Sequence, residues 1–233
     1  MVTISGMSTH TDTLASMAVA PIGAGMMVGL GTGRAASRAI RALAARAAAE
    51  GLSVRCVATS DASAVLARSL GLHVVDFAGV ERVDYIFDGA DEVDEALRML
   101  KGRGGAMTRE KIVARAASRR VYLIDESKLV RRLGEKFPLP VEVLPFAMGA
   151  VQAALGRTGL RAAVREEEGG GAYVTDNGCA VLDVALGEGM EPEGVDALLN
   201  DTPGVIGHGL FLDEADEVLI ENSAGSVERR TRV

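Results

Sequence analysis

The sequence predicts an α/β fold: a mostly parallel sheet with helices on both faces, plus a second, smaller α+β unit. Over the first 137 residues, short runs that are apolar throughout alternate with helical runs, as in a parallel sheet buried on both sides. After Phe137 the sequence changes to prolines, glycine-rich turns and two further helical runs. This change indicates that a separate unit begins there.

The first unit follows residues 1–12, which are small and polar and are expected to form a loose leader. The run 34–51 is rich in Ala and Arg, contains no helix breaker and ends at Gly51, so it is expected to be a helix. The other expected helices are a short one from Leu14 and residues 61–71 and 108–119. The expected strands are residues 26–33, 53–60, 73–77, 82–91 and 120–128.

The second unit is expected over residues 138–206, with the order strand–helix–strand–strand–helix–strand of a split βαβ unit. Its helices are expected within 146–159 and 191–204. Residues 209–223 are expected to supply strands that return to the main sheet, so the main unit combines 1–137 with 207–233. The last seven residues, "VERRTRV", are expected to be a solvated tail.

Composition argues against several classes of partner. The chain has 233 residues, 48% of them hydrophobic and 24% charged, which are ordinary proportions for a globular protein. The net charge of −7 argues against nucleic acid or an anionic membrane as a partner. No apolar run approaches the roughly 18 residues that span a membrane, and no signal peptide is recognised. A cytoplasmic protein is expected, with Cys56 and Cys179 as buried thiols.

The first expected strand ends in glycines, at "VGLGTGRAAS". Gly29, Gly31 and Gly33 follow G-x-G-x-G, which does not match the dinucleotide fingerprint, and no acidic residue ends the second strand. A glycine turn before a helix presents free backbone N–H groups to an anion, and Thr32 adds a hydroxyl. The turn predicts a phosphate site; the alternative is a turn that needs only the backbone freedom of glycine.

Another expected strand ends in carboxylates at Asp88 and Asp91, on the same edge of the sheet. Alone, "DGAD" is typical of a turn. Here Lys101 opens a second glycine-rich stretch, directly before a helix whose first turns carry Glu110. Carboxylate, ammonium and amide donors at one edge can move a proton beside a carbonyl group. The alternative for Glu110 is an ordinary surface charge.

Neither a metal nor a cofactor is expected. The three histidines, His10, His73 and His208, are scattered along the chain, and no spacing of ligand residues indicates a metal site.

The order and spacing of eight motifs resemble those of the type A ribose-5-phosphate isomerases, from about residue 14 to the C-terminus. The motifs are "GLGTG", "ATSDAS", "DGADEVD", "LKGRGGAMTREKIVA", "DESKLV", "FPLPVEVLP", "VTDNGCAVLDV" and "TPGVIGHGLF". The resemblance implies a Rossmann-like α/β domain with a ferredoxin-like lid domain. It also implies the cofactor-free interconversion of ribose 5-phosphate and ribulose 5-phosphate, in a homodimer or homotetramer.

The resemblance further implies roles for individual residues. Glu110 would be the general base that moves a proton between C2 and C1 through a cis-enediolate, and Lys101 would stabilise the oxyanion with the amides of the glycine loop. Asp88 and Asp91 would bind sugar hydroxyls and assist ring opening or proton relay. The residues expected to bind substrate are Gly31, Thr32, Gly33, Arg34, Gly89, Ala90, Gly102, Arg103, Gly104 and Lys128.

The chain departs from the family pattern at four positions. Arg34 and Ala35 stand where the family has hydroxyl residues ("GTGST"), and Arg103 replaces a glycine. His208, in "GHG", stands where the family commonly has an "ENG"-like stretch. Arg34 can bind phosphate through its guanidinium fork or crowd the pocket. Arg103 would be strained if its position needs a positive φ.

Three alternatives to an isomerase remain at this point. A sugar-phosphate-sensing module of a regulator would need a basic DNA-binding segment, which is missing before the first strand. A catalytically altered paralogue with shifted specificity is consistent with the changed first turn. A nicotinamide-dependent enzyme is disfavoured by the glycine spacing.

Overall fold

The computed structural model describes residues 12–167 and 169–232. The predicted leader at 1–12, apart from Asp12, and His10 within it lie outside the described residues. Asp12 precedes the first helix, α1 (Thr13–Val19), and its carboxylate accepts a hydrogen bond from the backbone of Ala15. This cap starts the short helix that was expected from Leu14.

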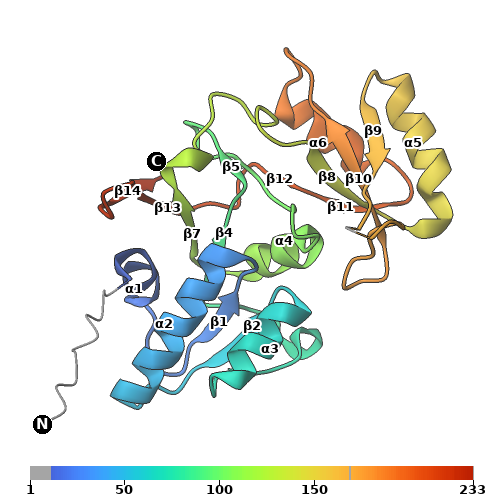
Figure 1. Cartoon of the computed structure of the whole chain (residues 1–233). Helices are drawn as coiled ribbons and strands as arrows, with labels where there is room; N and C mark the ends of the chain where they lie inside the picture. Colours follow the sequence, from blue (N-terminus) through green and yellow to red (C-terminus); the bar gives the residue numbers. More distant parts are fainter. Residues whose placement is uncertain (1–11, 168, 233) are drawn as a thin grey trace, which may run out of the picture.

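A seven-stranded sheet forms the centre of the main unit (Figure 1). Its order is β14-β13-β7-β4-β1-β2-β3, and every pair is parallel except β13 with β14. The parallel strands therefore have the 3-2-1-4-5-6 order of a doubly wound fold. The strands are β1 (Met27–Leu30), β2 (Arg55–Ala58), β3 (His73–Val74), β4 (Tyr85–Gly89), β7 (Arg120–Asp125), β13 (Glu217–Glu221) and β14 (Val227–Thr231).

Both faces of this sheet are covered. On one face, α1, α2 (Arg34–Glu50) and α3 (Asp61–Ser69) share a core with Val28 and Leu30 of β1. On the other face, Val113 of α4 (Met107–Ala116) packs with Met27 and Ile86. The predicted α/β fold with a mostly parallel sheet is confirmed, and α2 ends at Gly51 with φ of 64°, as its sequence indicated.

A three-stranded sheet covers the remaining part of the second face. It has the order β12-β6-β5, and its strands are β5 (Glu92–Val93), β6 (Met99–Leu100) and β12 (Leu210–Phe211). Met99 and Phe211 pack against Tyr122 and Ile124 of the main sheet. β5 and β6 were not predicted, because two-residue strands show no periodicity. β12 lies in the run 209–223, which was expected to return to the main sheet; only β13 does so, whereas β12 pairs with β6.

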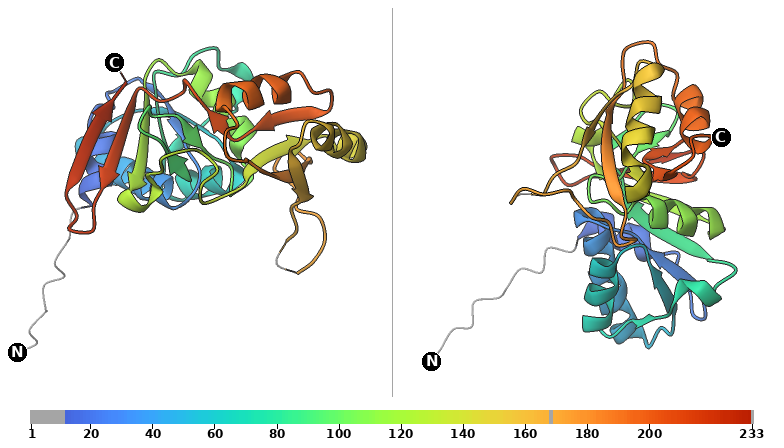
Figure 2. Two further views of the ribbon diagram at one scale, coloured as in Figure 1. Left: turned by 90° about the horizontal axis from the view of Figure 1, so that it is seen from above. Right: turned by 90° about the vertical axis from the view of Figure 1, so that its right-hand side faces the viewer.

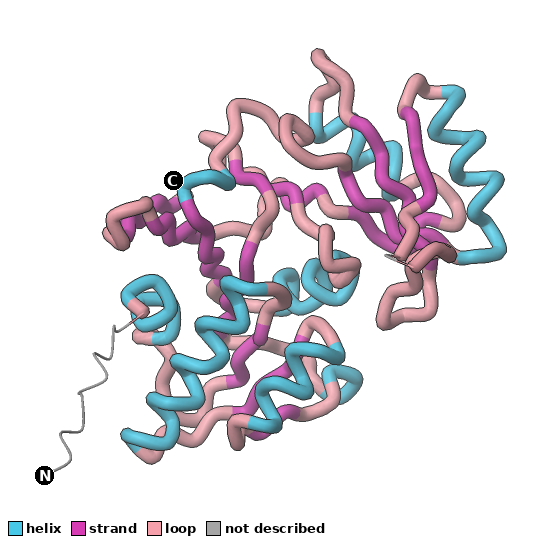
Figure 3. Tube along the Cα trace, in the orientation of Figure 1, coloured by secondary structure: helices cyan, strands magenta, loops and turns pink. Residues whose placement is uncertain are grey.

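The smaller unit is an antiparallel sheet of four strands with the order β11-β8-β10-β9, at one end of the main unit (Figures 2 and 3). Its strands are β8 (Leu139–Val143), β9 (Arg161–Val164), β10 (Ala180–Ala185) and β11 (Val205–His208), and its helices are α5 (Met148–Arg157) and α6 (Pro192–Asn200). Short 3₁₀ helices cover Phe77–Gly79, Glu126–Lys128 and Pro145–Ala147. The predicted boundaries of the smaller unit, residues 138–206, stay a prediction. If β11 is counted in this unit, the unit ends at His208.

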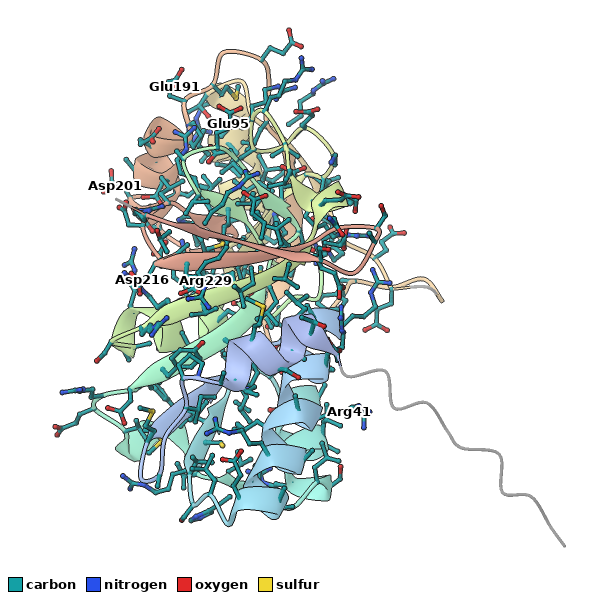
Figure 4. The ribbon with its side chains drawn as sticks, turned by 90° about the vertical axis from the view of Figure 1, so that its left-hand side faces the viewer. Arg41, Glu95, Glu191, Asp201, Asp216 and Arg229 are labelled. Carbon is teal, nitrogen blue, oxygen red and sulfur yellow. The ribbon has the colours of Figure 1, made fainter. Side chains whose placement is uncertain are left out.

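The expected solvated tail is instead an edge strand, so that prediction is wrong. β14 pairs with β13 from Glu217–Thr231 to Glu221–Val227. Its charges are matched by neighbours, since Arg229 Nε lies 3.1 Å from Glu217 Oε1. Figure 4 labels Arg229 on this edge. The charged residues hid the strand because an exposed edge does not need the apolar alternation of a buried one.

Cys56 and Cys179 are both free and buried, as predicted. Within residues 12–167 and 169–232, no helix combines the length and apolar character that crossing a bilayer requires.

Candidate functional site

A cavity of about 470 Å³ opens where the strand order reverses, at the carboxyl ends of β1 and β4. Ligands of open α/β sheets bind at such a point. The cavity wall is formed by Leu14, Thr32, Gly33, Arg34, Ala35, Arg38, Gly89, Ala90, Asp91, Lys101, Gly102, Arg103, Gly104, Glu110, Leu123, Ile124, Asp125 and Lys128. Of the predicted site residues, only Gly31 and Asp88 are missing from this wall, since both are buried behind it.

The first turn is fixed to β4 by Asp88. Its Oδ1 accepts hydrogen bonds from the backbone N–H of Thr32 at 2.9 Å and of Gly89 at 2.7 Å. A side chain at Gly31 would place its Cβ 2.2 Å from that oxygen. Glycine is thus required at 31 because Asp88 approaches the turn so closely. The Thr32 hydroxyl lies 2.7 Å from that of Thr59.

One ammonium group joins two buried carboxylates on the floor of the cavity. Lys101 Nζ lies 3.1 Å from Asp88 Oδ2 and 3.3 Å from Glu110 Oε2, and it also donates to the Gly89 carbonyl oxygen. The relative exposures of the side chains of Lys101, Asp88 and Glu110 are 3%, 1% and 5%. Neither Asp88 Oδ2 nor Glu110 Oε2 has a partner with hydrogen-bond geometry among the described residues.

Two aromatic rings pack near Lys101 on the side that faces the core. The ring centres of Tyr122 and Phe211 lie 5.6 Å and 5.5 Å from Lys101 Nζ. Both rings are fully buried, so they exclude water from the side of the ammonium that faces the core. Low local polarity strengthens the attraction between Lys101 and the carboxylates.

Burial and neighbouring charge shift the protonation of all three groups. Burial, reinforced by the charge of Asp88, raises the pKa of Glu110 to about 8. Burial also raises the pKa of Asp88, against the pull of Lys101. Burial alone would lower the pKa of Lys101, but the carboxylates of Asp88 and Glu110 outweigh it and raise the pKa to about 12. The lysine therefore stays charged while Glu110 gains and loses a proton near neutral pH.

The glycine loop after Lys101 turns through two left-handed residues. Gly102 has φ of 101° and Gly105 has φ of 73°, whereas Arg103 is not among the residues with positive φ. The strain considered for Arg103 therefore does not arise. Its backbone N–H donates to Asp91 Oδ2 at 3.0 Å, and its guanidinium lies 4.1 Å from the ring centre of Phe137.

Three cationic side chains border the open part of the cavity. Arg34, the first residue of α2, is exposed on the wall and forms no hydrogen bond or ion pair with other described residues. Lys128 lies with its ammonium 5.4 Å from the ring centre of Phe137. Arg38, which was not predicted, binds Asp12 and Glu221 at 2.6 Å and 2.8 Å.

Six wall residues were missed from the sequence: Leu14, Ala35, Arg38, Leu123, Ile124 and Asp125. Two of them carried a signal. Arg38 lies four residues after Arg34 in the helix expected at 34–51, and so on the same side. Asp125 follows the apolar run of β7, at the carboxyl edge where ligands bind.

His208 lies away from the cavity wall, in β11. Its Nε2 is 3.2 Å from Asn200 Oδ1, and burial, with the positive charges of Lys111 and Arg115, lowers its pKa to about 3. The imidazole is neutral and links β11 to α6. Among residues 12–167 and 169–232, no cluster of His, Cys, Asp and Glu has the arrangement of a metal site.

Comparisons of sequence identify relatives. The sequence profile of the family described as Ribose 5-phosphate isomerase A (phosphoriboisomerase A) matches residues 55–225. Ribose-5-phosphate isomerase A of Thermomicrobium roseum is 48% identical over 202 residues, which are 86% of this chain and 85% of the relative. The protein of that name from Sphingopyxis alaskensis is 47% identical over 84% of this chain and 85% of its own length.

Comparison with solved structures identifies the same family as the comparison of sequences. Ribose 5-phosphate isomerase A of Methanocaldococcus jannaschii superposes with a TM-score of 0.89 at 39% identity, over 94% of this chain and 97% of the other. A D-ribose-5-phosphate isomerase in complex with phospho-erythronic acid gives a TM-score of 0.90 at 34% identity, over 95% and 97%. The resemblance drawn from the eight motifs is confirmed. The chain belongs to the ribose 5-phosphate isomerase A family.

Proposed function

We propose that this chain interconverts ribose 5-phosphate and ribulose 5-phosphate in the cavity at the end of β1 and β4, with Glu110 as the base. The observation that carries this proposal is the ammonium of Lys101 between the buried carboxylates of Asp88 and Glu110. Family membership supports an isomerase and gives no support to a sensing module or an altered paralogue.

The proton transfer follows from the charges on the cavity floor. In the open-chain aldose, Glu110 takes the proton from C2, and the electron pair moves to the carbonyl oxygen at C1, giving an enediolate. The ammonium of Lys101 and the amides of the glycine loop stabilise the negative oxygen. Glu110 then returns the proton to C1, while a hydroxyl proton moves from O2 to O1, which yields the ketose. Asp91, on the cavity wall, binds sugar hydroxyls. Asp88 was expected to do the same, but it is buried behind the wall and instead holds Lys101 and the first turn.

One oxygen of Glu110 supports this role, because it forms an ion pair with Lys101 at 3.3 Å but has no hydrogen bond among the described residues. A buried carboxylate oxygen without a hydrogen bond is costly unless it serves a ligand or a reaction. Glu110 Oε2 is in this state and belongs to a residue on the cavity wall.

The phosphate of the substrate is expected at the first turn. Gly33 and Arg34 begin α2, which has neither an acidic residue in its first turn nor a side-chain cap. Its first backbone N–H groups can therefore bind an anion, together with the hydroxyl of Thr32. Arg34 and Lys128 add positive charge on the cavity wall.

The direct test is an assay of the purified chain with ribose 5-phosphate in metal-chelated buffer without added cofactor. Formation of ribulose 5-phosphate is expected. A purified, folded protein that forms no ketose would show the proposal to be wrong.

The reaction is expected to depend on pH through Glu110. The base must be ionised to take a proton, and its pKa lies at about 8. A single ionisation predicts that kcat/KM rises about tenfold per pH unit below that value and reaches a plateau above it. Initial rates over a range of roughly pH 6 to 10 measure this. A profile that is flat across pH 8, or that falls there, would exclude Glu110 as the titrating base.

Arg34 is expected to contribute to phosphate binding. Replacing it with serine, as in the family pattern, removes the guanidinium but retains a hydroxyl. We expect KM for ribose 5-phosphate to rise about threefold to thirtyfold with kcat changed less than twofold, since the lost interaction is equal in the ground and transition states. Steady-state kinetics of Arg34→Ser decide this. An unchanged KM would mean that Arg34 does not contact the phosphate.

The homodimer or homotetramer expected from the resemblance, and the cytoplasmic location, belong to the same proposal. A sedimentation experiment on the purified chain tests the first. A single species with the mass of one chain at micromolar concentration would contradict it.

A further inference from the structure

The glycine loop that follows Lys101 is held by the small unit, from outside the cavity. Arg165 Nη1 donates to the carbonyl oxygens of Gly102 at 2.9 Å and Arg103 at 3.0 Å. The Tyr173 hydroxyl donates to the carbonyl oxygen of Gly104 at 3.0 Å. Three successive carbonyl groups of the loop thus have donors from two residues that do not line the cavity.

Both donors lie in the segment between β9 and β10 and are held by contacts of their own. The guanidinium of Arg165 forms a two-point pair with Asp183 of β10, at 2.5 Å and 3.0 Å, and its side chain is 13% exposed. The backbone N–H of Tyr173 donates to the Arg165 carbonyl oxygen at 2.9 Å, so the two residues lie side by side. Rigid donors of this kind hold the loop in one orientation.

A glycine in the loop allows Tyr173 to come this close. A Cβ at Gly105 would lie 2.3 Å from the Tyr173 hydroxyl oxygen. The absence of a side chain at 105 therefore allows the hydroxyl to reach the loop, in addition to allowing its positive φ.

Fixing the carbonyl groups of the loop also fixes the direction of its backbone N–H groups. In a planar trans peptide, the N–H of one residue points opposite to the carbonyl of the residue before it. The Arg103 N–H, opposite the Gly102 carbonyl, donates to Asp91 on the cavity wall. The Gly104 N–H, opposite the Arg103 carbonyl, has no acceptor among the residues that the structure describes, and Gly104 is exposed on the same wall.

We infer that Arg165 and Tyr173 are positioning residues that aim the Gly104 N–H at the oxygen that gains negative charge during isomerisation. The inference rests on the proposed function. Neither residue touches the substrate. Arg165 holds the Arg103 carbonyl, which lies opposite the Gly104 N–H. Tyr173 holds the carbonyl of Gly104 itself, so the peptide groups on both sides of Gly104 are fixed before the charge develops. Donors oriented in advance stabilise a transition state most, because they do not reorganise during the reaction.

Two substitutions test this, each with a matched control. Tyr173→Phe removes only a hydroxyl, and its control is Tyr85→Phe, whose hydroxyl donates to the Ala18 carbonyl oxygen at 2.7 Å far from the loop. Arg165→Lys keeps the positive charge beside Asp183 but loses the planar guanidinium, which binds Asp183 and the loop carbonyls at the same time. Its control is Arg46→Lys, because Arg46 also pairs with a carboxylate, Glu50, and donates to backbone carbonyls, those of Val19 and Ile22 at 2.7 Å and 2.8 Å.

For Arg165→Lys we expect kcat to fall about tenfold to a hundredfold and for Tyr173→Phe about threefold to tenfold, less than the loss of a whole oxyanion donor. KM for ribose 5-phosphate and inhibition by inorganic phosphate should change less than about twofold. The inhibition constant of a phosphorylated aldonic acid, whose carboxylate imitates the enediolate, should rise by the same factor as kcat falls. The two controls should show neither kinetic change, even where Tm decreases.

Wild-type-like kcat and aldonic-acid inhibition in both loop variants would overturn the inference and leave the proposed function in place. Equal losses in the variants and their controls, following Tm, would also overturn it, since they indicate a merely structural role. If Arg165→Lys does not fold, Tyr173→Phe decides alone. Failure of the unsubstituted protein to convert ribose 5-phosphate would instead disprove the proposed function, and this inference with it.

Discussion

Replacing Glu110 with glutamine should lower kcat for ribose 5-phosphate by about 10³-fold, with KM changed less than about threefold. Glutamine has nearly the same shape and keeps an oxygen for Lys101, but it cannot accept a proton from carbon. General base catalysis contributes typically 10²–10⁴-fold, so a loss in this range is expected if Glu110 carries the proton. Steady-state kinetics and the solvent exchange of the C2 proton, followed by NMR, both measure it.

A matched control is Glu217→Gln. Glu217 is also a buried glutamate in ion pairs, with Arg119 at 2.9 Å and Arg229 at 3.1 Å, but it begins β13, at the end of the sheet opposite the cavity. This variant should lose stability and keep kcat. If Glu110→Gln retained more than a tenth of the wild-type kcat, another group would have to be the base.

Replacing Lys101 with methionine should affect both activity and folding. Methionine fills much of the same volume but leaves Asp88 and Glu110 buried together without a cation. Removing one partner of a buried ion pair typically costs about 3–5 kcal/mol in the free energy of unfolding. Loss of the charge beside the developing oxyanion should also lower kcat by about 10²–10³-fold. Urea unfolding and steady-state kinetics measure the two effects.

The loss of stability in Lys101→Met should itself depend on pH. Without the ammonium, the carboxyl pKa values of Asp88 and Glu110 rise further, so the folded state binds more protons than the unfolded state. The deficit relative to the unsubstituted protein should therefore grow as pH increases and shrink as pH decreases towards the ordinary pKa of carboxyl groups.

The double variant Lys101→Met with Glu110→Gln should recover part of the lost stability, because one of the two buried charges is gone. As a control, Lys136→Met should change the free energy of unfolding by less than about 1 kcal/mol, because Lys136 is exposed. An equal cost for Lys101→Met at all pH values would contradict the buried charge cluster.

The parts of the site that lie within one short motif could be predicted from the sequence. The rule that ligands bind at the carboxyl ends of parallel strands placed Thr32 and Asp91 on one edge. Lys101 was added because a glycine-rich stretch and a helix follow it directly. The orientation of Glu110 could not be predicted in this way, because its position on a short helix is compatible with both a surface charge and a cavity wall. Packing of α4 against β8 and β11 decides between them.

Contacts between distant segments are also invisible in a single sequence. Arg165 and Tyr173 lie more than sixty residues from the loop they hold, as shown by their separations of 63 and 69 residues from Gly102 and Gly104. Nothing in the composition of that hairpin indicates the partner. For the same reason, the packing of the Tyr122 and Phe211 rings against Lys101 could not be predicted, since both look like ordinary core residues in the sequence.

The two outer strands of the main sheet differ in a way that bears on self-association. β3 contains only His73 and Val74, so it offers few free backbone groups to an incoming strand. β14 is longer but carries Glu228, Arg229 and Arg230 in succession, and a second copy laid alongside would have to desolvate them. Neither edge strand favours pairing with a strand of another molecule, and this protects the sheet against amyloid-like growth. Copies of this chain should therefore not assemble by extending the seven-stranded sheet.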